Sequence, residues 1–134
     1  MFTSLMAVPV RGRLLSEFLA PMVGTLLETH PRACLLFALG DDVDTAVRKY
    51  KGRAGDEATY TRTLWERWAE RFRIVHPTPA STDGELDALV CATVAYLYHH
   101  APENLLRLTD KASGMRGRGP FYVIASGSER EGIF

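Results

Sequence analysis

The chain has 134 residues, of which 46% are hydrophobic and 24% charged, as in an ordinary globular protein with one core. Lysine plus arginine and aspartate plus glutamate number 16 each, so the formal net charge is zero. A protein that coats nucleic acid without specificity is usually basic, because its affinity comes largely from neutralising phosphates. The charge balance therefore disfavours that class, but it leaves room for an enzyme with a local basic rim.

Targeting and redox features point to the cytoplasm. The N-terminal residues contain no long apolar run after a basic stretch, which disfavours a signal peptide. The apolar stretches are far shorter than the ~20 residues needed to span a bilayer. Cys34 and Cys91 lie in apolar helical contexts without a C-x-x-C pair, so buried free thiols are favoured over a disulfide. We expect a cytoplasmic protein that does not contact membranes.

The first part of the chain predicts a strand between two helices. Residues 1–10 are apolar and suit an arm or short strand, and leucines at helical spacing predict a helix over residues 11–22. Residues 25–30 resemble a central strand, which Pro31 ends. Pro31 also suits the first turn of a helix that Gly40 would end.

The middle of the chain predicts further helices. Asp41 or Asp42 can cap a short helix that leads to a glycine-rich basic loop over residues 49–55. An apolar stripe at four-residue spacing predicts the longest helix over residues 56–72. A short strand over residues 73–76 follows, before a turn-rich linker.

The last part begins with a strong helix signal. Thr82 and Glu85 form a capping box ahead of an apolar helical face that extends to Leu97. A small helix is predicted over residues 103–109, and a closing strand over residues 121–125. The sequence as a whole predicts a single α/β domain over residues 1–134, with a few strands and about five helices.

Glu28 is the first candidate for chemistry, because it ends an apolar strand. A carboxylate there is costly to bury unless it meets a cation, a hydrogen-bond donor or an open cleft. In open α/β sheets such clefts lie beyond the carboxyl ends of the strands. The alternative, which weighs equally, is a strand-end glutamate in a salt bridge or in water.

Asp83 and Asp87 are the second candidate group. They lie four residues apart near the start of one predicted helix and so on the same side of it. Together they could share a divalent cation such as Mg²⁺ or Mn²⁺. The competing interpretation is that Asp83 caps the helix and Asp87 complements its dipole. In the basic loop, Arg48, Lys51 and Arg53 could contact a nucleic-acid backbone, or could simply be solvated.

One family shows the same segments in the same order, from about Arg11 to Ala125. The segments are RGRLLSEFL, a strand ending in ETHPRA, a Tyr-Lys-Gly loop, ELDALVCATVAYL and GPFYVIAS. This order resembles domain-of-unknown-function family 429, whose members are predicted nucleases with an RNase H-like fold. The resemblance implies that Glu28 is the carboxylate of the fourth strand and Asp87 that of the final helix, together holding a divalent metal. Lys51 matches the family's loop lysine.

The chain departs from this pattern at its beginning. An RNase H-like fold opens with three strands, the first of which carries a metal-binding aspartate. Residues 1–27 contain no aspartate, and Glu17 is their only acid. The expectation is therefore an N-terminally truncated, partial RNase H-like fold that comprises the C-terminal portion. Its exposed sheet edge would invite a second copy or a partner chain.

Three functions remain open. The first is a metal-dependent nuclease domain that lacks the first-strand aspartate and hydrolyses phosphodiesters. The second is a catalytically inactive binding or structural module of the same fold. The third is an unrelated small α/β protein whose motif match is a coincidence.

Overall fold

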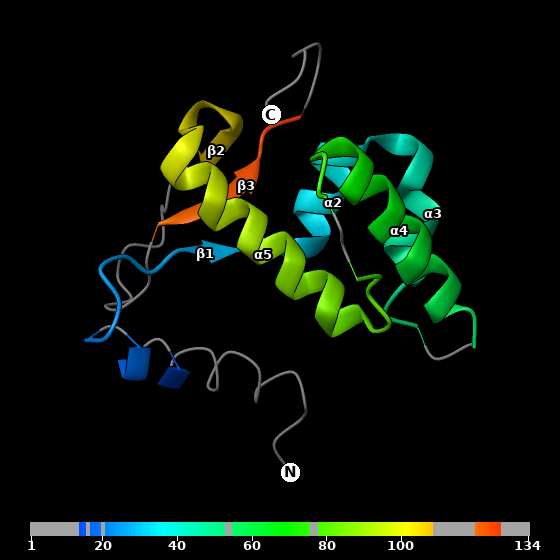
Figure 1. Ribbon diagram of the computed structural model, residues 1–134, viewed down its shortest axis with the longest axis horizontal. Helices are drawn as coiled ribbons and strands as arrows, with labels where there is room; N and C mark the ends of the chain where they lie inside the picture. The colour runs from blue at the N-terminus through cyan, green and yellow to red at the C-terminus, as the bar shows by residue number, and fades with distance from the viewer. Residues whose placement is uncertain are drawn as a thin grey trace. The chain divides into compact units, whose positions relative to one another are not determined.

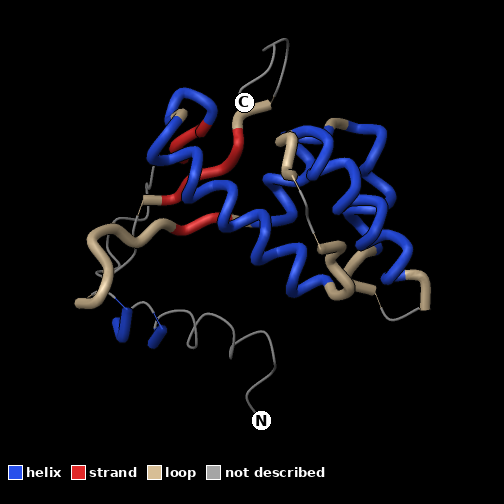
Figure 2. Tube along the Cα trace, in the orientation of Figure 1, coloured by secondary structure: helices blue, strands red, loops and turns tan. Residues whose placement is uncertain are grey.

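The computed structural model describes residues 14–15, 17–19, 21–52, 55–75, 78–108 and 120–126. The fold is mixed α/β, as the sequence predicts. The helices and strands are α2 (Pro31–Leu39), α3 (Asp44–Lys49), α4 (Glu57–Arg71), α5 (Asp83–His100), β1 (Glu28–Thr29), β2 (Leu105–Leu108) and β3 (Phe121–Ile124). Two 3-10 turns, η1 (Asp41–Val43) and η2 (Pro102–Asn104), connect them. Figures 1 and 2 show these elements along the chain.

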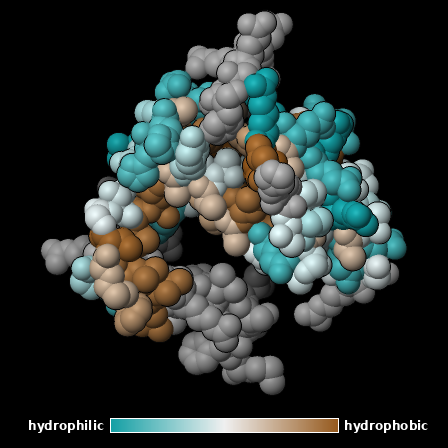
Figure 3. All heavy atoms as spheres, in the orientation of Figure 1, coloured by the Kyte–Doolittle hydropathy of each residue, from teal (hydrophilic) through white to brown (hydrophobic). Residues whose placement is uncertain are grey.

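The chain divides into two compact units. The first comprises Met1–Glu28 and Arg107–Tyr122, and the second Thr29–Leu106 and Val123–Phe134. In the first unit, the described residues between 14 and 19 are helical, which agrees with the predicted helix over residues 11–22 where the two can be compared. Apolar side chains are exposed along this segment (Figure 3), including Leu14, Phe18 and Met22. The predicted arm over residues 1–10 lies outside the described residues.

Helices α2, α3, α4 and α5 form the core of the second unit. Helix α2 contacts each of the other three, and α4 also packs on α3 and α5. Figure 1 shows α2, α3 and α4 gathered beside the long helix α5. Their apolar faces bury a set of large side chains: Leu35, Val47, Tyr50, Leu64, Trp68, Leu86, Val90, Val94 and Leu97. Helices α3 and α5 therefore pack against the same two helices, α2 and α4.

Local signals explain the bounds of α2. Pro31 occupies its first turn, where a missing N–H costs nothing. His30 precedes it in an extended conformation, and its Nδ1 accepts a hydrogen bond of 3.3 Å from the amide of Ala33. The helix ends at Gly40, whose φ of 84° is open to glycine without strain. The predicted helix from Pro31 to Gly40 is therefore confirmed.

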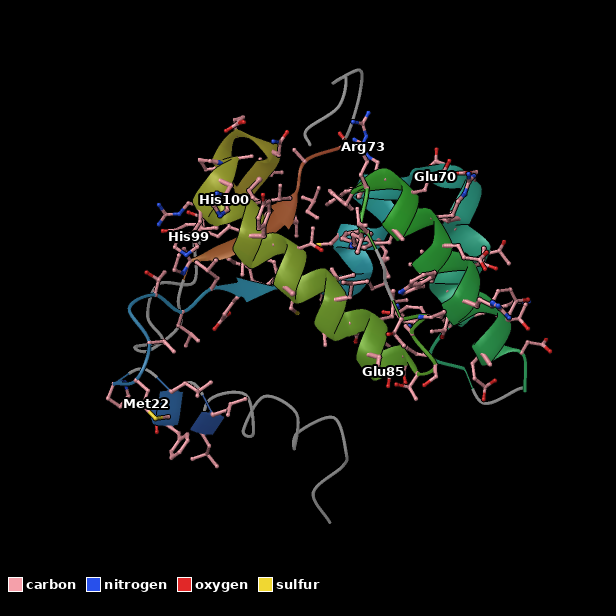
Figure 4. All side chains as sticks on the ribbon, in the orientation of Figure 1. Met22, Glu70, Arg73, Glu85, His99 and His100 are labelled. Carbon is pink, nitrogen blue, oxygen red and sulfur yellow. The ribbon has the colours of Figure 1, made fainter. Side chains whose placement is uncertain are left out.

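Helix α5 is the longest described helix, with 18 residues against 15 in α4. The prediction that residues 56–72 form the longest helix was wrong in rank, although α4 closely follows the predicted bounds. The physical reason lies at both ends of α5. The predicted capping box is present at Thr82 and Glu85, and no proline follows until Pro102, so the helix continues to His100. Figure 4 shows Glu85 at one end of α5 and His99 and His100 at the other.

Two predicted elements differ in the structure. Residues 73–75 are irregular rather than a strand, because Arg73 has a φ of 48° and ends α4 in a left-handed turn. His76 lies outside the described residues. The predicted helix over residues 103–109 is instead one 3-10 turn, η2, followed by the strand β2. The amide of Ala125 donates a hydrogen bond of 2.9 Å to the carbonyl of Asn104 beside it.

The described strands pair in the order β1-β3-β2. The predicted closing strand is confirmed as β3. The prediction that residues 25–30 form the central strand was wrong, because β3 is the central strand of the described sheet. Of residues 25–30, only Glu28 and Thr29 are in a strand, and residues 25–27 are not. Pro31 cannot donate a hydrogen bond to the sheet, so the strand ends before it. The amide of Glu28 donates to the carbonyl of Pro120 at 3.1 Å.

Among the described residues, no helix combines the length and the apolar character needed to cross a bilayer.

Candidate functional site

Asp87 lies near the start of α5, and its carboxylate meets the end of α3. Tyr50 follows the last residue of α3 and is 1% exposed. Its hydroxyl donates a hydrogen bond of 2.9 Å to Oδ1 of Asp87, across 37 positions of the chain. The side chain of Asp87 is 22% exposed, so it is partly accessible to solvent.

Lys51 completes the contacts of this carboxylate. Its ammonium donates to Oδ2 of Asp87 and forms an ion pair with it. The same Nζ lies 5.3 Å from the centroid of the Tyr50 ring, within the range of a cation–π contact. Asp87 therefore has a neutral donor on one oxygen and a charged donor on the other.

Arg32 approaches the same ring from α2. Its Cζ lies 5.6 Å from the centroid of the Tyr50 ring. We call Arg32, Tyr50, Lys51 and Asp87 the Tyr50 cluster. It combines two cations with one carboxylate around a buried phenol, and all four residues belong to the second compact unit.

The environment of Tyr50 keeps its phenol protonated. Burial raises the pKa of Tyr50 well above its ordinary value, and the hydrogen bond to the Asp87 carboxylate raises it further. The nearby guanidinium of Arg32 opposes this shift weakly. The phenol is therefore a fixed hydrogen-bond donor to Asp87 at any physiological pH.

The other carboxylates predicted for the site lie in different settings. Glu28 belongs to the first compact unit and is half-buried, whereas Asp87 belongs to the second. Asp83 is the first residue of α5 and is exposed to solvent. The residue that caps this helix is Thr82, whose hydroxyl accepts from the amide of Glu85.

The predicted basic residues separate into three cases. Lys51 joins Asp87, as described above. Arg48 is exposed, and its Nε pairs with Oδ2 of Asp44 at 2.6 Å, one helical turn away. That hydrogen bond raises the pKa of the Arg48 guanidinium. Arg53 lies outside the described residues.

The two thiols differ from each other. Both cysteines are free, as expected; Cys34 is fully buried in α2, with its sulfur 3.3 Å from the Thr29 hydroxyl. Cys91 is exposed, which corrects the expectation that both thiols are buried. The reason is its place on the outer side of α5, one turn after Asp87.

The Tyr50 cluster contains one carboxylate that could bind a metal ion, Asp87. Within the described part of the chain, no three or more His, Cys, Asp or Glu side chains converge in a way that could hold a metal ion. Asp87 supplies hard carboxylate oxygens, the ligand type that Mg²⁺ and Mn²⁺ prefer, and Mg²⁺ often uses one or two carboxylates together with water and substrate phosphates. In donor type, Asp87 fits such an ion, although Tyr50 and Lys51 already contact both of its oxygens.

The sequence did not single out Arg32, and it did not connect Tyr50 with Asp87. Both signals were local and weak. Arg32 is a cation in the first turn of a helix, where the helix dipole disfavours positive charge. Tyr50 sits at the apolar spacing of α3, which indicates burial, but nothing in that spacing identifies Asp87 as its partner.

Comparisons with protein-family models, with curated proteins and with solved structures found no match to this chain. Its function is therefore inferred from the Tyr50 cluster, from Glu28 and from the motif order of the sequence.

Proposed function

We propose that the chain is a metal-dependent nuclease domain of RNase H-like type, with Asp87 and Glu28 as its catalytic carboxylates. The observation that supports this proposal best is the contact between Lys51 and Asp87, across 36 positions. These two residues were matched to the family pattern separately, one in a loop and one in a helix. If the resemblance to the family were a coincidence, there would be no reason to expect a contact between Lys51 and Asp87.

Each residue of the cluster has a distinct role in this proposal. Tyr50 and Lys51 orient the Asp87 carboxylate, since each donates to a different oxygen. Asp87 would supply oxygen ligands for Mg²⁺ or Mn²⁺, which often bind one or two carboxylates together with water and substrate phosphates. When bound, such an ion activates water and stabilises the leaving oxygen of a phosphodiester. Lys51, Arg48 and Arg53 would contact the nucleic-acid backbone.

A catalytically inactive binding or structural module of the same fold is the second candidate. The observation that favours it is the engagement of both Asp87 oxygens, because a carboxylate so paired is also a good structural link between two helices.

We also propose a partner chain for one edge of the described sheet. Strand β1 stands at one end of the described strand order, with β3 beside it. A second copy of the chain, or another protein, would supply a strand to that edge. Sedimentation equilibrium tests this idea, and a strictly monomeric, fully folded protein would contradict it.

The decisive experiment measures metal binding and cleavage in the same set of variants. Mn²⁺ affinity is determined by calorimetry, and cleavage of single- and double-stranded DNA and RNA is followed with and without Mn²⁺. We expect Asp87→Asn and Glu28→Gln each to reduce metal-dependent cleavage by at least about 100-fold, as loss of a metal ligand does. Glu66→Gln is the matched control, because Glu66 is an exposed carboxylate paired with Arg62 on α4.

The two candidates give different outcomes. Metal-dependent cleavage that is lost in both variants and kept in Glu66→Gln supports the nuclease. Absence of cleavage, together with an Mn²⁺ affinity that Asp87→Asn leaves unchanged, removes the metal site and leaves the inactive module.

A further inference from the structure

We propose that Arg32 and Lys51 form a phosphate-binding pair beside Asp87. Only the nature of the ligand, a phosphodiester of a nucleic acid, rests on the proposed nuclease function. The pair itself is inferred from the positions and charges of the Tyr50 cluster.

The two cations converge on one ring from different elements. Arg32 comes from the first turn of α2, and Lys51 from the residues that follow α3. Their charged groups lie 5.6 Å and 5.3 Å from the centroid of the Tyr50 ring, so they are separated by at most the sum of these distances. Neighbouring phosphates of a polynucleotide, or a single phosphate after small side-chain movements, can span such a gap. Both side chains remain partly accessible to solvent.

The position of Arg32 is unfavourable for stability. It lies in the first turn of α2, where the helix dipole disfavours a cation. The first turn of α2 also contains no acidic residue to offset this charge. A bound anion would reverse the effect, because it would face both the guanidinium and the N-terminal end of the helix.

Arg32 also differs from the described arginines that form ion pairs. Arg48, Arg62 and Arg67 each form an ion pair with a nearby carboxylate. No ion pair between described residues involves Arg32, whose guanidinium lies over the ring of Tyr50 and also hydrogen-bonds to that side chain. The donors of its planar fork that Tyr50 does not take can meet an oxyanion, since guanidinium groups bind phosphate in a bidentate manner.

The local charge suits a phosphodiester. Two cations and the single carboxylate of Asp87 leave one positive charge in the cluster, and a phosphodiester carries one negative charge. The platform beneath is rigid, because the Tyr50 ring is 1% exposed and its hydroxyl is held by Asp87. An anion bound here therefore requires little reordering of the protein, which favours affinity.

The test is a binding measurement in the presence of EDTA, so that no metal and no cleavage are involved. Fluorescence anisotropy follows a labelled oligo-thymidylate, and inorganic phosphate is added as a competitor in a second arm. The variants are Arg32→Gln and Lys51→Gln, since glutamine removes the charge and keeps a hydrogen-bond donor. Arg62→Gln on α4 is the matched control, because it makes the same change of charge at an exposed site away from the cluster.

We expect Arg32→Gln and Lys51→Gln each to weaken oligonucleotide binding about tenfold, as the loss of one charged hydrogen bond does. Each should also lower the slope of log affinity against log salt by about one. Arg62→Gln should leave both quantities nearly unchanged. Equal losses in all three variants, or no loss in the first two, would overturn the phosphate pair.

Failure of this pair and failure of the nuclease proposal can be told apart. Asp87→Asn should abolish cleavage without weakening oligonucleotide binding, because it removes a negative charge from the cluster and keeps both cations. If inorganic phosphate binds in a manner that depends on Arg32 and Lys51 but the oligonucleotide does not bind, the phosphate pair stands and the nucleic-acid substrate is wrong. If the wild-type protein binds neither, the pair itself is refuted.

Discussion

The hydroxyl of Tyr50 lies 2.9 Å from Oδ1 of Asp87 and joins the end of α3 to the first half of α5. These residues are 37 positions apart, and the segment between them includes the whole of α4. Neither partner is fully solvated, so the bond contributes both to stability and to the orientation of the carboxylate.

Removing the hydroxyl should destabilise the fold modestly. Tyr50→Phe keeps the ring and its contacts with Arg32 and Lys51 but leaves one Asp87 oxygen without its phenolic donor. We expect the free energy of unfolding to fall by about 1 kcal/mol. Urea unfolding followed by circular dichroism measures it. An unchanged midpoint would show that water replaces the phenol without cost.

The same residue should make stability sensitive to alkaline pH. Burial, and then the hydrogen bond to Asp87, raise the pKa of Tyr50 in the folded protein above its value of about 10 in the unfolded chain. The neutral phenol is therefore favoured by folding, and its stabilising contribution is complete below about pH 10 and is lost as pH rises above it. The stability difference between wild type and Tyr50→Phe should be constant from pH 7 to 9 and shrink above pH 10. A difference that does not change with pH would contradict this assignment.

The hydrogen bonds of the Thr93 hydroxyl in the core can be tested by substitution. Its hydroxyl accepts a hydrogen bond of 3.1 Å from Nε1 of Trp68, and donates one of 2.9 Å to the carbonyl of Leu89. Thr93→Val has a similar volume but leaves the buried indole N–H without an acceptor, which should cost about 1–3 kcal/mol. Thr93→Ser keeps the acceptor and serves as the control. Thermal unfolding and tryptophan fluorescence should place the valine variant well below the serine variant in stability.

The capping box at the start of α5 predicts both a mutational and a pH effect. Thr82→Ala should cost about 1 kcal/mol, because the amide of Glu85 loses its acceptor. Hydrogen bonds from the amide and hydroxyl of Ser81, and from the amide of Thr82, lower the pKa of Glu85 in the folded state. The ionised form is therefore favoured by folding, and its contribution is present above about pH 4.3 and is lost as pH falls through the lowered folded value.

This acid effect is tested with Glu85→Ala. The variant should be less stable than wild type at pH 6, and the difference should become small near pH 2. Urea unfolding at a series of pH values provides the measurement. A difference that persists unchanged into acid would mean that the charge of Glu85 contributes nothing.

Two glycines should respond to alanine in opposite directions. Gly40 has a φ of 84° and ψ of −173°, a conformation that is strained for any residue with a Cβ, so Gly40→Ala should cost about 1–3 kcal/mol. Gly84 lies within the first turn of α5, and an added Cβ there would have Thr82 Oγ1 as its nearest neighbour, at 4.0 Å. Gly84→Ala should therefore stabilise the protein by about 0.5–1 kcal/mol. Melting temperatures that shift in the same direction would refute this pair of predictions.

The elements that the sequence predicted well have local causes. The capping box defines the start of α5 through residues only three apart. Pro31 and Gly40 likewise define α2 without help from distant residues. The strand over residues 105–108 was predicted as part of a helix, because its conformation comes from pairing with β3 rather than from its own apolar spacing.

In the candidate site, too, single residues were predicted from local patterns, whereas contacts between distant residues were not. Asp87 and Lys51 were recognised one by one, from helix position and from motif order. Their contact, and the role of Tyr50 in it, depend on how α3 packs near α5, which no local pattern encodes. Arg32 was missed for a similar reason, since its partner is a ring on another element.

The place of α4 between Tyr50 and Asp87 along the chain has a consequence for ligand-linked dynamics. Helix α4 packs on α2, α3 and α5, yet contributes no residue to the Tyr50 cluster. Local opening of α4 must disturb the packing of all three helices that carry or flank the cluster. Any ligand that tightens the cluster should therefore slow amide hydrogen exchange in α4, where the ligand makes no contact. Hydrogen exchange in the interior of α4 would therefore show whether the ligand is bound, although α4 is not part of the binding site.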